Sequence, residues 1–160
     1  MGIEIEHKFL LRDDRWRQQV ERSIPMRQGY LMSNSRCSVR VRLADGKGFL
    51  NIKSGTLGIQ RSEYEYPIPS AEAEELLDTL CEKPLLEKTR HLVRHHGHLW
   101  EIDEFAGANA GLAVAELELD RPDEIFVRPD WLGEDVSHDV RYYNSQLARH
   151  PYTTWSCPSD

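Results

Sequence analysis

Hydrophobic and charged residues alternate along much of the chain, in short segments separated by turn signals such as the one from Asp45 to Gly48. In an extended strand, successive side chains point to opposite faces, so an alternating segment has one face of each kind. In the first segment, Ile3 and Ile5 share one face and Glu4 shares the other with Glu6. The same partition predicts strands over residues 3–9, 26–32, 39–43, 50–53, 61–66, 88–90, 100–103 and 115–119.

Three other segments show apolar residues at helical spacing. The first is short and follows Asp13 or Asp14 as its N-cap. The second has Ser70 as its N-cap, and the third runs from Ser137 to Ala148. Their apolar positions are, in the same order, Trp16 and Val20; Ala73, Leu76, Leu77 and Leu80; and Val140, Tyr143 and Leu147.

The charged strand faces have two interpretations. Alternation is typical of any antiparallel sheet that has one face in water. Solvated faces also carry many Thr, Ser and Gln residues, however, whereas these faces consist almost entirely of Glu, Asp, Arg and Lys. Closing about eight such strands into a barrel places every charged face inside, around a space for side chains or one small ligand. We therefore expect a mainly β protein with flanking helices (α+β), built on a closed, antiparallel, eight-stranded β-barrel tunnel whose outward apolar faces the helices cover.

The lumen of this barrel carries nearly balanced charge. Its acidic residues are Glu4, Glu6, Glu63, Glu65, Glu101, Asp103, Glu116 and Glu118. Its basic residues are Lys8, Arg40, Arg42, Lys53, Arg61, Lys88 and Arg90. Two carboxylates about 4 Å apart repel by roughly 4 kcal/mol at an effective dielectric constant of about 20, so the acidic pairs imply raised pKa values or bound cations. Hard divalent cations with oxygen ligands, Mg²⁺ or Mn²⁺, fit such pairs, and two of them turn the lumen into a cradle for a chain of phosphates.

Composition narrows the class of protein further. The chain has 160 residues and a net charge of −7, which fits one domain and argues against a nucleic-acid-binding or basic membrane-surface protein. No segment has the ~20 apolar residues of a membrane span. The cysteines Cys37, Cys81 and Cys157 are scattered, without a metal-binding or disulfide pattern. We expect a cytoplasmic protein in which residues 1–148 form the domain and residues 149–160 a C-terminal tail.

The segment from Glu4 to Lys8 is similar to the ExExK motif of the CYTH superfamily, the triphosphate tunnel metalloenzymes. Further motifs of this family follow in order. They are Arg-Gln-Gly-Tyr at 27–30, Val-Arg-Val-Arg at 39–42, Ile-Lys at 52–53, Arg-Ser-Glu-Tyr-Glu at 61–65, Glu-Lys-Thr-Arg at 87–90, Glu-Ile-Asp-Glu-Phe at 101–105 and Glu-Leu-Glu at 116–118. Segment 131–144 resembles the bacterial members as well, so the resemblance covers nearly the whole chain. It implies a tunnel that binds a triphosphate and hydrolyses it with divalent metal ions.

The resemblance also implies roles for the lumen residues. Metal ligands are expected at Glu4, Glu6, Glu116 and Glu118, with Asp103 in addition. Substrate phosphates are expected to bind Lys8, Arg40, Arg42, Lys53, Arg61, Lys88 and Arg90. The group that takes the proton of the attacking water is open among Lys8, Lys88 and a nearby carboxylate such as Glu63. We expect Mg²⁺ or Mn²⁺ as cofactor, two ions per site, and a small-molecule triphosphate as partner, without nucleic acid or membrane.

The substrate is a separate question, because the superfamily also contains thiamine triphosphatases and class IV adenylate cyclases. Those relatives usually carry an Asp-x-Tyr-Tyr-Asp-Thr-like strand before the Arg-x-Arg strand. This chain has residues 27–32 there, similar to the small bacterial inorganic triphosphatases, so we expect inorganic tripolyphosphate. The alternatives are a nucleoside or thiamine triphosphatase, a cyclase, and a module that binds polyphosphate or nucleotide without hydrolysing it. A lipocalin-like carrier needs an apolar lumen and is opposed by the charged one.

Overall fold

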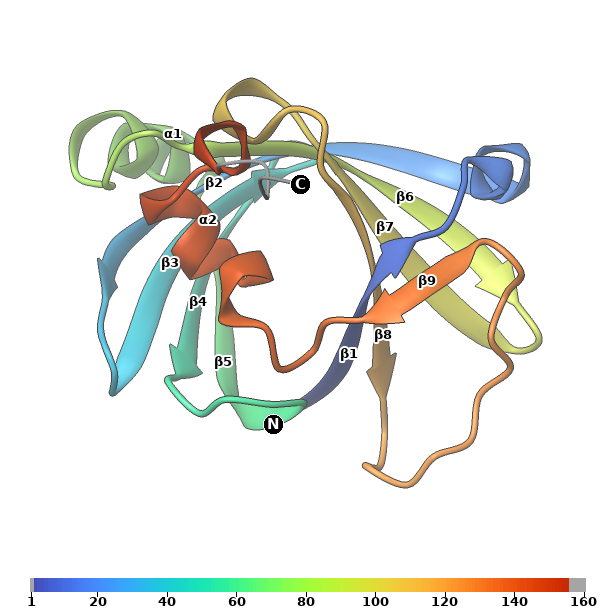
Figure 1. Ribbon diagram of the computed structural model, residues 1–160. Coiled ribbons are helices and arrows are strands. Elements are labelled where there is room, and N and C mark those ends of the chain that lie inside the picture. Colours follow the sequence, from blue (N-terminus) through green and yellow to red (C-terminus); the bar gives the residue numbers. More distant parts are fainter. Residues whose placement is uncertain (1, 156–160) are drawn as a thin grey trace.

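Antiparallel strands curve around a central opening in the computed structural model, which describes residues 2–155 (Figure 1). The strands are β1 (Ile3–Leu11), β2 (Val20–Ser33), β3 (Cys37–Ala44), β4 (Lys47–Ser54), β5 (Gln60–Ile68), β6 (Leu86–His95), β7 (His98–Phe105), β8 (Ala113–Leu119) and β9 (Leu132–Asp135). Their order is β5-β4-β3-β2-β6-β7-β8-β1, and β5 also pairs with β1. Every pairing is antiparallel, so the predicted eight-stranded barrel is confirmed, with β9 added beside β1.

The pairing register places the charged residues inside the barrel. Lys8 of β1 lies opposite Glu116 of β8, and Arg90 of β6 lies opposite Asp103 of β7. Directly opposite residues of an antiparallel pair share one face of the sheet. All four side chains are buried although they carry charge. The inward face that the alternation predicts is therefore confirmed.

The outer surface of the barrel is covered in two places. Trp16, on the 3₁₀ helix η1 (Arg15–Gln19), and Trp131 pack with Trp100 in one cluster of buried apolar residues. Helix α1 (Ser70–Thr79) lies outside the ring of strands and packs on β3 and β4 (Figure 1). Burying apolar surface contributes about 25 cal/mol per Å², so these two clusters hold the covering segments on the barrel.

Several expectations about the helices and the outer faces are wrong. Tyr64 and Tyr66 on β5 are 49% and 52% exposed, so no helix among the described residues covers the outward face there. Pro69, not Ser70, is the N-cap of α1. Leu80 is the C-cap of this helix and is 66% exposed, so it is not part of the buried stripe. Val20 begins β2 and does not extend η1.

The C-terminal helix is shorter than predicted. Residues Val140–Tyr142 form a 3₁₀ turn, η3, and the α-helix α2 spans only Asn144–Arg149. Ser137 does not cap it, because its Oγ accepts a hydrogen bond from the backbone N–H of Lys8 on β1 (2.9 Å). Val140 is exposed, whereas Leu147 is fully buried as expected.

One end of the lumen is apolar and is filled by α2. Val114 lies opposite Asp103, and Phe105 lies opposite Lys88, so both side chains point inward. They form one cluster with Leu147 of α2. The interior of the barrel is therefore charged at one end and closed by packed apolar side chains at the other.

The wall of the barrel is thin between β1 and β5. These strands pair only from Ile3 to Ile5, and the next contact is a hydrogen bond from Glu6 N to Ile59 O (2.8 Å). Residues 136–143, which we call the strap, then cross this gap, and Val136 N donates to Lys8 O (2.8 Å). A segment far along the chain thus completes the wall next to the first strand.

The remaining described residues add little to the architecture. The 3₁₀ turns η2 (Gly107–Asn109) and η4 (Tyr152–Thr154) lie outside the barrel strands, and Trp155 packs on Tyr142 and on η4. Cys37 and Cys81 are free thiols, while Cys157 and the rest of residues 156–160 lie outside the described part. The domain boundary at residue 148 stays a prediction. Within residues 2–155, every helix is too short or too polar to cross a membrane.

Candidate metal and anion site

A cavity of about 160 Å³ lies in the charged part of the lumen. Only charged and amide side chains line it. They are Glu4, Glu6, Arg40, Arg42, Asn51, Lys53, Arg61, Glu63, Glu65, Arg90, Glu101, Glu116, Glu118 and Asn144. Such a lining suits a small charged ligand and offers nothing to an apolar one.

Three carboxylates converge on one wall of this cavity. Glu6, Glu101 and Glu116 each offer an oxygen, and these oxygens all lie within 4.8 Å of one another. The register explains the convergence, because Glu101 lies opposite Glu116 across β7 and β8, and Glu6 follows on the next strand, β1. Burial, and then the neighbouring carboxylates of Glu116 and Glu4, raise the pKa of Glu6 well above its usual value. A cation bound among these oxygens would relieve that repulsion.

The burial, hydrogen bonding and pKa of Glu116 indicate whether this cluster can bind a divalent cation. Its side chain is 4% exposed, and its Oε1 has no hydrogen-bond donor within the described chain. Burial tends to raise the pKa of Glu116, but Lys8, whose Nζ lies 3.6 Å from Oε1, and Arg90 lower it to about 2. The oxygen is therefore ionised, buried and free to accept. An oxygen of this kind, facing two other carboxylates, fits a ligand of a hard divalent cation.

Two arginines on β3, the buried Arg40 and the half-buried Arg42, lack a carboxylate partner within the described residues. The other arginines of the cavity, Arg61 and Arg90, form ion pairs with carboxylates, whereas within residues 2–155 neither Arg40 nor Arg42 does so. Arg40 is 4% exposed, and its Nε has no hydrogen-bond partner among the described residues. Burial, and then the charges of Arg40 and Arg90, lower the pKa of Arg42 to about 10. Buried unpaired cations are unfavourable, so this pair fits a bound anion.

The carboxylate of Glu4 already forms ion pairs with two basic side chains of the protein. Lys53 Nζ lies 3.2 Å and 3.0 Å from its two carboxylate oxygens, and Arg61 Nε donates to Oε1 at 2.9 Å. Lys53 Nζ also pairs with Glu63 (3.1 Å). Burial tends to raise the pKa of Glu4, but Lys53, a hydrogen bond with Glu63, and Arg61 hold it well below its usual value. Glu4 is accordingly near Glu6 but is not one of the three carboxylates whose oxygens converge.

Asp103 and Lys88 form a fully buried pair away from the cavity lining. Lys88 Nζ donates to Asp103 Oδ2 (2.6 Å), and Arg90 donates to both oxygens of Asp103 (2.8 and 2.9 Å). Both Lys88 and Asp103 have side chains that are 0% exposed. Burial lowers the pKa of Lys88 to about 7 in spite of Asp103, while Arg90 and Lys88 outweigh burial and keep the pKa of Asp103 well below its usual value. The role of Asp103 as a metal ligand stays a prediction.

The predicted site residues otherwise gather around the cavity. Of these residues, only Lys8, Lys88 and Asp103 are absent from its lining. Lys8 adjoins the cavity, where its Nζ contacts Glu116 and donates to Tyr142 O of the strap (2.9 Å). Glu101 is the residue that the expected ligand set omits. Glu101 lies two residues before Asp103 on β7, so both side chains face the lumen. Only the pairing of β7 with β8 shows that Glu101 lies next to Glu116.

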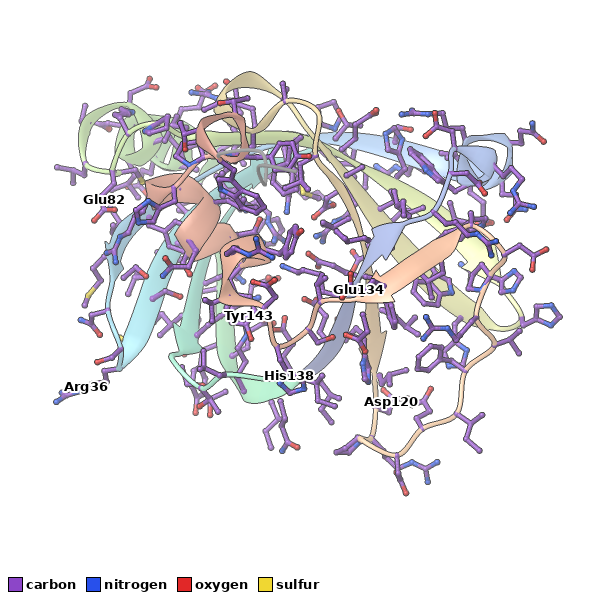
Figure 2. The ribbon with its side chains drawn as sticks, in the orientation of Figure 1. Arg36, Glu82, Asp120, Glu134, His138 and Tyr143 are labelled. Atoms are coloured by element: carbon purple, nitrogen blue, oxygen red, sulfur yellow. The ribbon has the colours of Figure 1, made fainter. Side chains whose placement is uncertain are left out.

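A second, wider cavity of about 390 Å³ adjoins the first one. It is lined by Ser, Thr, Asn and Gln side chains together with Leu57, Arg61, Val140, Tyr143 and Arg149. Tyr143 lies beside the central opening, where the strap crosses it (Figure 2). Its hydroxyl accepts a hydrogen bond from Gly58 N (3.1 Å) and donates to Ser137 O (2.8 Å). The strap is thereby fixed to the loop that precedes β5.

Comparison with known proteins agrees with this geometry. The family model described as the CYTH domain matches residues 2–152. The chain belongs to the CYTH domain family. The match spans all nine strands and α2, so every residue that lines the charged cavity lies inside the CYTH domain.

Relatives of this CYTH protein include two curated inorganic triphosphatases. The one from Acetivibrio thermocellus is 46% identical over 152 residues, which cover 95% of this chain and 97% of that protein. The one from Nitrosomonas europaea is 36% identical over 149 residues, which cover 91% and 96%. A crystal structure of an inorganic triphosphatase matches this CYTH fold with a TM-score of 0.65 and 35% identity, covering 91% of this chain and 93% of the other.

Proposed function

We propose that this CYTH protein hydrolyses inorganic tripolyphosphate, with Mg²⁺ or Mn²⁺, inside the barrel. The observation that carries the proposal is that a carboxylate cluster and a pair of arginines without carboxylate partners among the described residues line one cavity. On one side are the carboxylates of Glu6, Glu101 and Glu116, and on the strand across the barrel are Arg40 and Arg42. A complex of divalent cation and polyphosphate satisfies both groups at once. The relatives named inorganic triphosphatases support tripolyphosphate as the substrate.

The proposal divides the lumen between cation and phosphate. The cations are held by Glu6, Glu101 and Glu116, joined by Glu4 and Glu118. The phosphate oxygens bind Lys8, Arg40, Arg42, Lys53, Arg61, Lys88 and Arg90. A bound divalent cation neutralises charge on phosphate oxygens and lowers the pKa of a water bound to it. Asp103 acts as a positioning residue, because its two oxygens fix the side chains of Lys88 and Arg90.

The protein residues then orient the substrate and move a proton. Arg40 and Arg42 hold phosphate oxygens in a place that excludes bulk water, where each charge-assisted hydrogen bond is strong. Lys8, Lys88 and Glu63 are the candidates for the acceptor of the proton from the attacking water, and each is held by a neighbour. Burial lowers the pKa of Lys88 to about 7, while its Nζ donates to Asp103 Oδ2. Lys8 Nζ donates to Tyr142 O, and Glu63 pairs with Lys53.

A nucleoside triphosphate is the second candidate substrate. The wider cavity beside the tunnel shares Arg61 with the charged cavity and offers neutral hydroxyl and amide groups. Its volume of about 390 Å³ lies within the range of about 300–1,000 Å³ typical of small-molecule pockets. An organic group attached to the last phosphate would enter this space.

A cytoplasmic location and a small-molecule substrate without nucleic acid are part of the same proposal. The free thiols of Cys37 and Cys81 are typical of a reducing compartment. The net charge of −7 opposes binding to the phosphate backbone of nucleic acids.

The test is phosphate release from tripolyphosphate, ATP and thiamine triphosphate, each with Mg²⁺, with Mn²⁺ and with chelator. We expect fast, metal-dependent release from tripolyphosphate and little from the other two. Arg40→Met should raise the Michaelis constant strongly, whereas Arg36→Met, at an exposed turn outside the tunnel (Figure 2), should not change it. Faster release from ATP would favour the second candidate. Binding without release from any of the three would contradict a hydrolase.

A further inference from the structure

Glu4 differs from Glu6 and Glu116 in the number of hydrogen bonds that its carboxylate accepts from cationic side chains of the described chain. Lys53 reaches both of its oxygens and Arg61 reaches one, at distances of 2.9–3.2 Å. Glu116 Oε1, in contrast, has no hydrogen-bond donor in the described chain. Arg90 donates to Glu101 (2.8 Å) and to Glu116 Oε2 (3.4 Å), but Glu116 Oε1 stays free to accept. In the ligand-free protein, therefore, the cluster of Glu6, Glu101 and Glu116 is more open to a divalent cation than Glu4 is.

The contacts of Glu4 follow from the pairing of β1 with β5, which closes the barrel. Glu4 lies directly opposite Arg61 in one of the few residue pairs that join β1 to β5. Lys53 lies opposite Glu63 across β4 and β5, and its Nζ contacts both Glu63 and Glu4. We call these four side chains the latch. Because the backbone pairing holds its members side by side, the latch is the resting arrangement of this end of the lumen.

The two cations of the latch also line the cavity that would hold the polyphosphate. A guanidinium binds phosphate oxygens through paired, charge-assisted hydrogen bonds, and an ammonium binds them as a point charge. A triphosphate therefore competes with Glu4 for Arg61 and Lys53. When these side chains turn to the phosphates, Glu4 is left buried, ionised and without a partner, which is unfavourable.

We propose that the latch allows a second divalent cation to bind only together with the substrate. In the free protein, Lys53 and Arg61 contact Glu4 and mask it. When polyphosphate oxygens bind Lys53 and Arg61 instead, Glu4, with Glu63 and Glu118, binds the second cation. The inference rests on the proposed function. It implies an order of binding in which the first cation enters the open cluster of the free protein and the second enters only with the polyphosphate. Glu118 fits this set because it lies opposite Glu6, beside the open cluster, and is exposed to the lumen mouth.

The first experiment counts bound Mn²⁺ by equilibrium dialysis in the absence of any phosphate compound. We expect about one ion per chain in the wild-type protein. In the double variant Lys53→Met with Arg61→Met, which lacks both masking cations, we expect about two bound ions per chain. Adding Glu4→Gln to that variant should return the count to about one, because the unmasked carboxylate is then missing.

The matched control is Arg40→Met with Arg42→Met, which removes two cations that line the same cavity and leaves Glu4 unchanged. Its count should stay at about one, so a rise there would mean that lost positive charge alone attracts Mn²⁺ and would overturn the latch. Two ions in the wild-type protein would also overturn it. Far-UV circular dichroism and the melting temperature show whether each variant is folded.

The second experiment uses only the wild-type protein and therefore does not depend on the folding of a variant. Imidotriphosphate, a triphosphate analogue with nitrogen bridges, is added to the Mn²⁺-loaded protein, and Mn²⁺–Mn²⁺ coupling is followed by electron paramagnetic resonance. We expect coupling only when both are present, and an unchanged spectrum with bound analogue would overturn the proposal. If the analogue does not bind at all, the proposed function fails, while the dialysis counts still decide whether Glu4 is masked.

Discussion

Glu101 and Glu104 lie three positions apart on β7 but face opposite sides of the barrel wall. Glu101 points into the cavity beside Glu116, whereas Glu104 pairs with Arg17 and His91 on the outer surface. The same substitution at the two positions therefore separates the cation cluster from general effects of lost charge.

We predict that Glu101→Gln weakens Mn²⁺ binding at least about 10- to 100-fold, since even residues that only support a metal ligand have effects of this size. Glu104→Gln should leave the affinity within a factor of about two. Isothermal titration calorimetry measures both. Equal losses of Mn²⁺ affinity in the two variants would show that Glu101 is not a ligand of the cation.

The second prediction for a single residue concerns the contribution of Asp103 to the free energy of unfolding. Asp103→Asn leaves Lys88 and Arg90 buried without their carboxylate, and we expect a loss of about 3–5 kcal/mol in the free energy of unfolding. Asp45→Asn, which breaks an exposed pair with Arg22, should change it by less than about 1 kcal/mol. Urea denaturation monitored by tryptophan fluorescence gives both values.

The effect of Asp103→Asn should also depend on pH. The folded protein holds the pKa of Asp103 well below the value of about 3.9 in an unfolded chain. Its ionised form therefore stabilises the protein above about pH 4, and this contribution is lost as the pH falls toward the folded-state pKa. The difference between wild type and variant should shrink in acid. A difference that grows below pH 4 would contradict the ion pair.

The sequence predicts the inward face of the strands more fully than it predicts the partners there. Alternation places Glu4, Lys53 and Glu101 in the lumen because the period of a strand is two residues. It contains no information on which strands are neighbours or in which register they pair. For this reason the latch of Glu4 and the proximity of Glu101 to Glu116 become visible only in the structure.

At the scale of secondary structure elements, α2 acts as the plug of the apolar end of the lumen. Its Leu147 is 0% exposed and packs with inward-facing residues of the barrel. We predict that Leu147→Ala lowers the free energy of unfolding by about 2–5 kcal/mol, as expected for a cavity left in a packed core. Leu80→Ala, at the exposed end of α1, should change it by no more than about 0.5 kcal/mol. Comparable losses in thermal or urea unfolding would show that α2 does not pack as described.

The bounds of the helices are less predictable from sequence than the strands. Apolar spacing from residue 137 onward is compatible with one continuous helix, but the strap needs extended backbone to reach β1 and β5. Ser137 is used to bind Lys8 N, and helical residues begin only at Asn144 after a 3₁₀ turn. Long-range hydrogen bonds thus override a local propensity.

At the scale of the whole molecule, charge couples the two ligands of the proposed reaction. The protein carries a net charge of −7, and its lumen alone does not attract a polyanion strongly. We predict that tripolyphosphate raises the melting temperature only when a divalent cation is present. At a ligand concentration of about 100 times Kd, the gain of about 2.7 kcal/mol corresponds to a shift of about 5–10 °C for a chain of this size.

Differential scanning fluorimetry in the presence of Ca²⁺, Mg²⁺ or Mn²⁺ measures this shift, with chelator as the control. Ca²⁺ is included because a bound but unreactive cation would keep the substrate intact during the scan. An equal shift in chelator would mean that the arginines bind the anion without help from a cation.

The strap and the short pairing of β1 with β5 also matter during synthesis on the ribosome. Among the described strands, β1 is synthesised before its neighbours β5, β8 and β9, so its pairing is complete only when residue 135 has emerged. Contacts between such distant parts of a chain form slowly. Until then a growing chain exposes the strand that carries Glu4, Glu6 and Lys8, and its charged side chains keep that unpaired edge from joining the strands of other nascent chains.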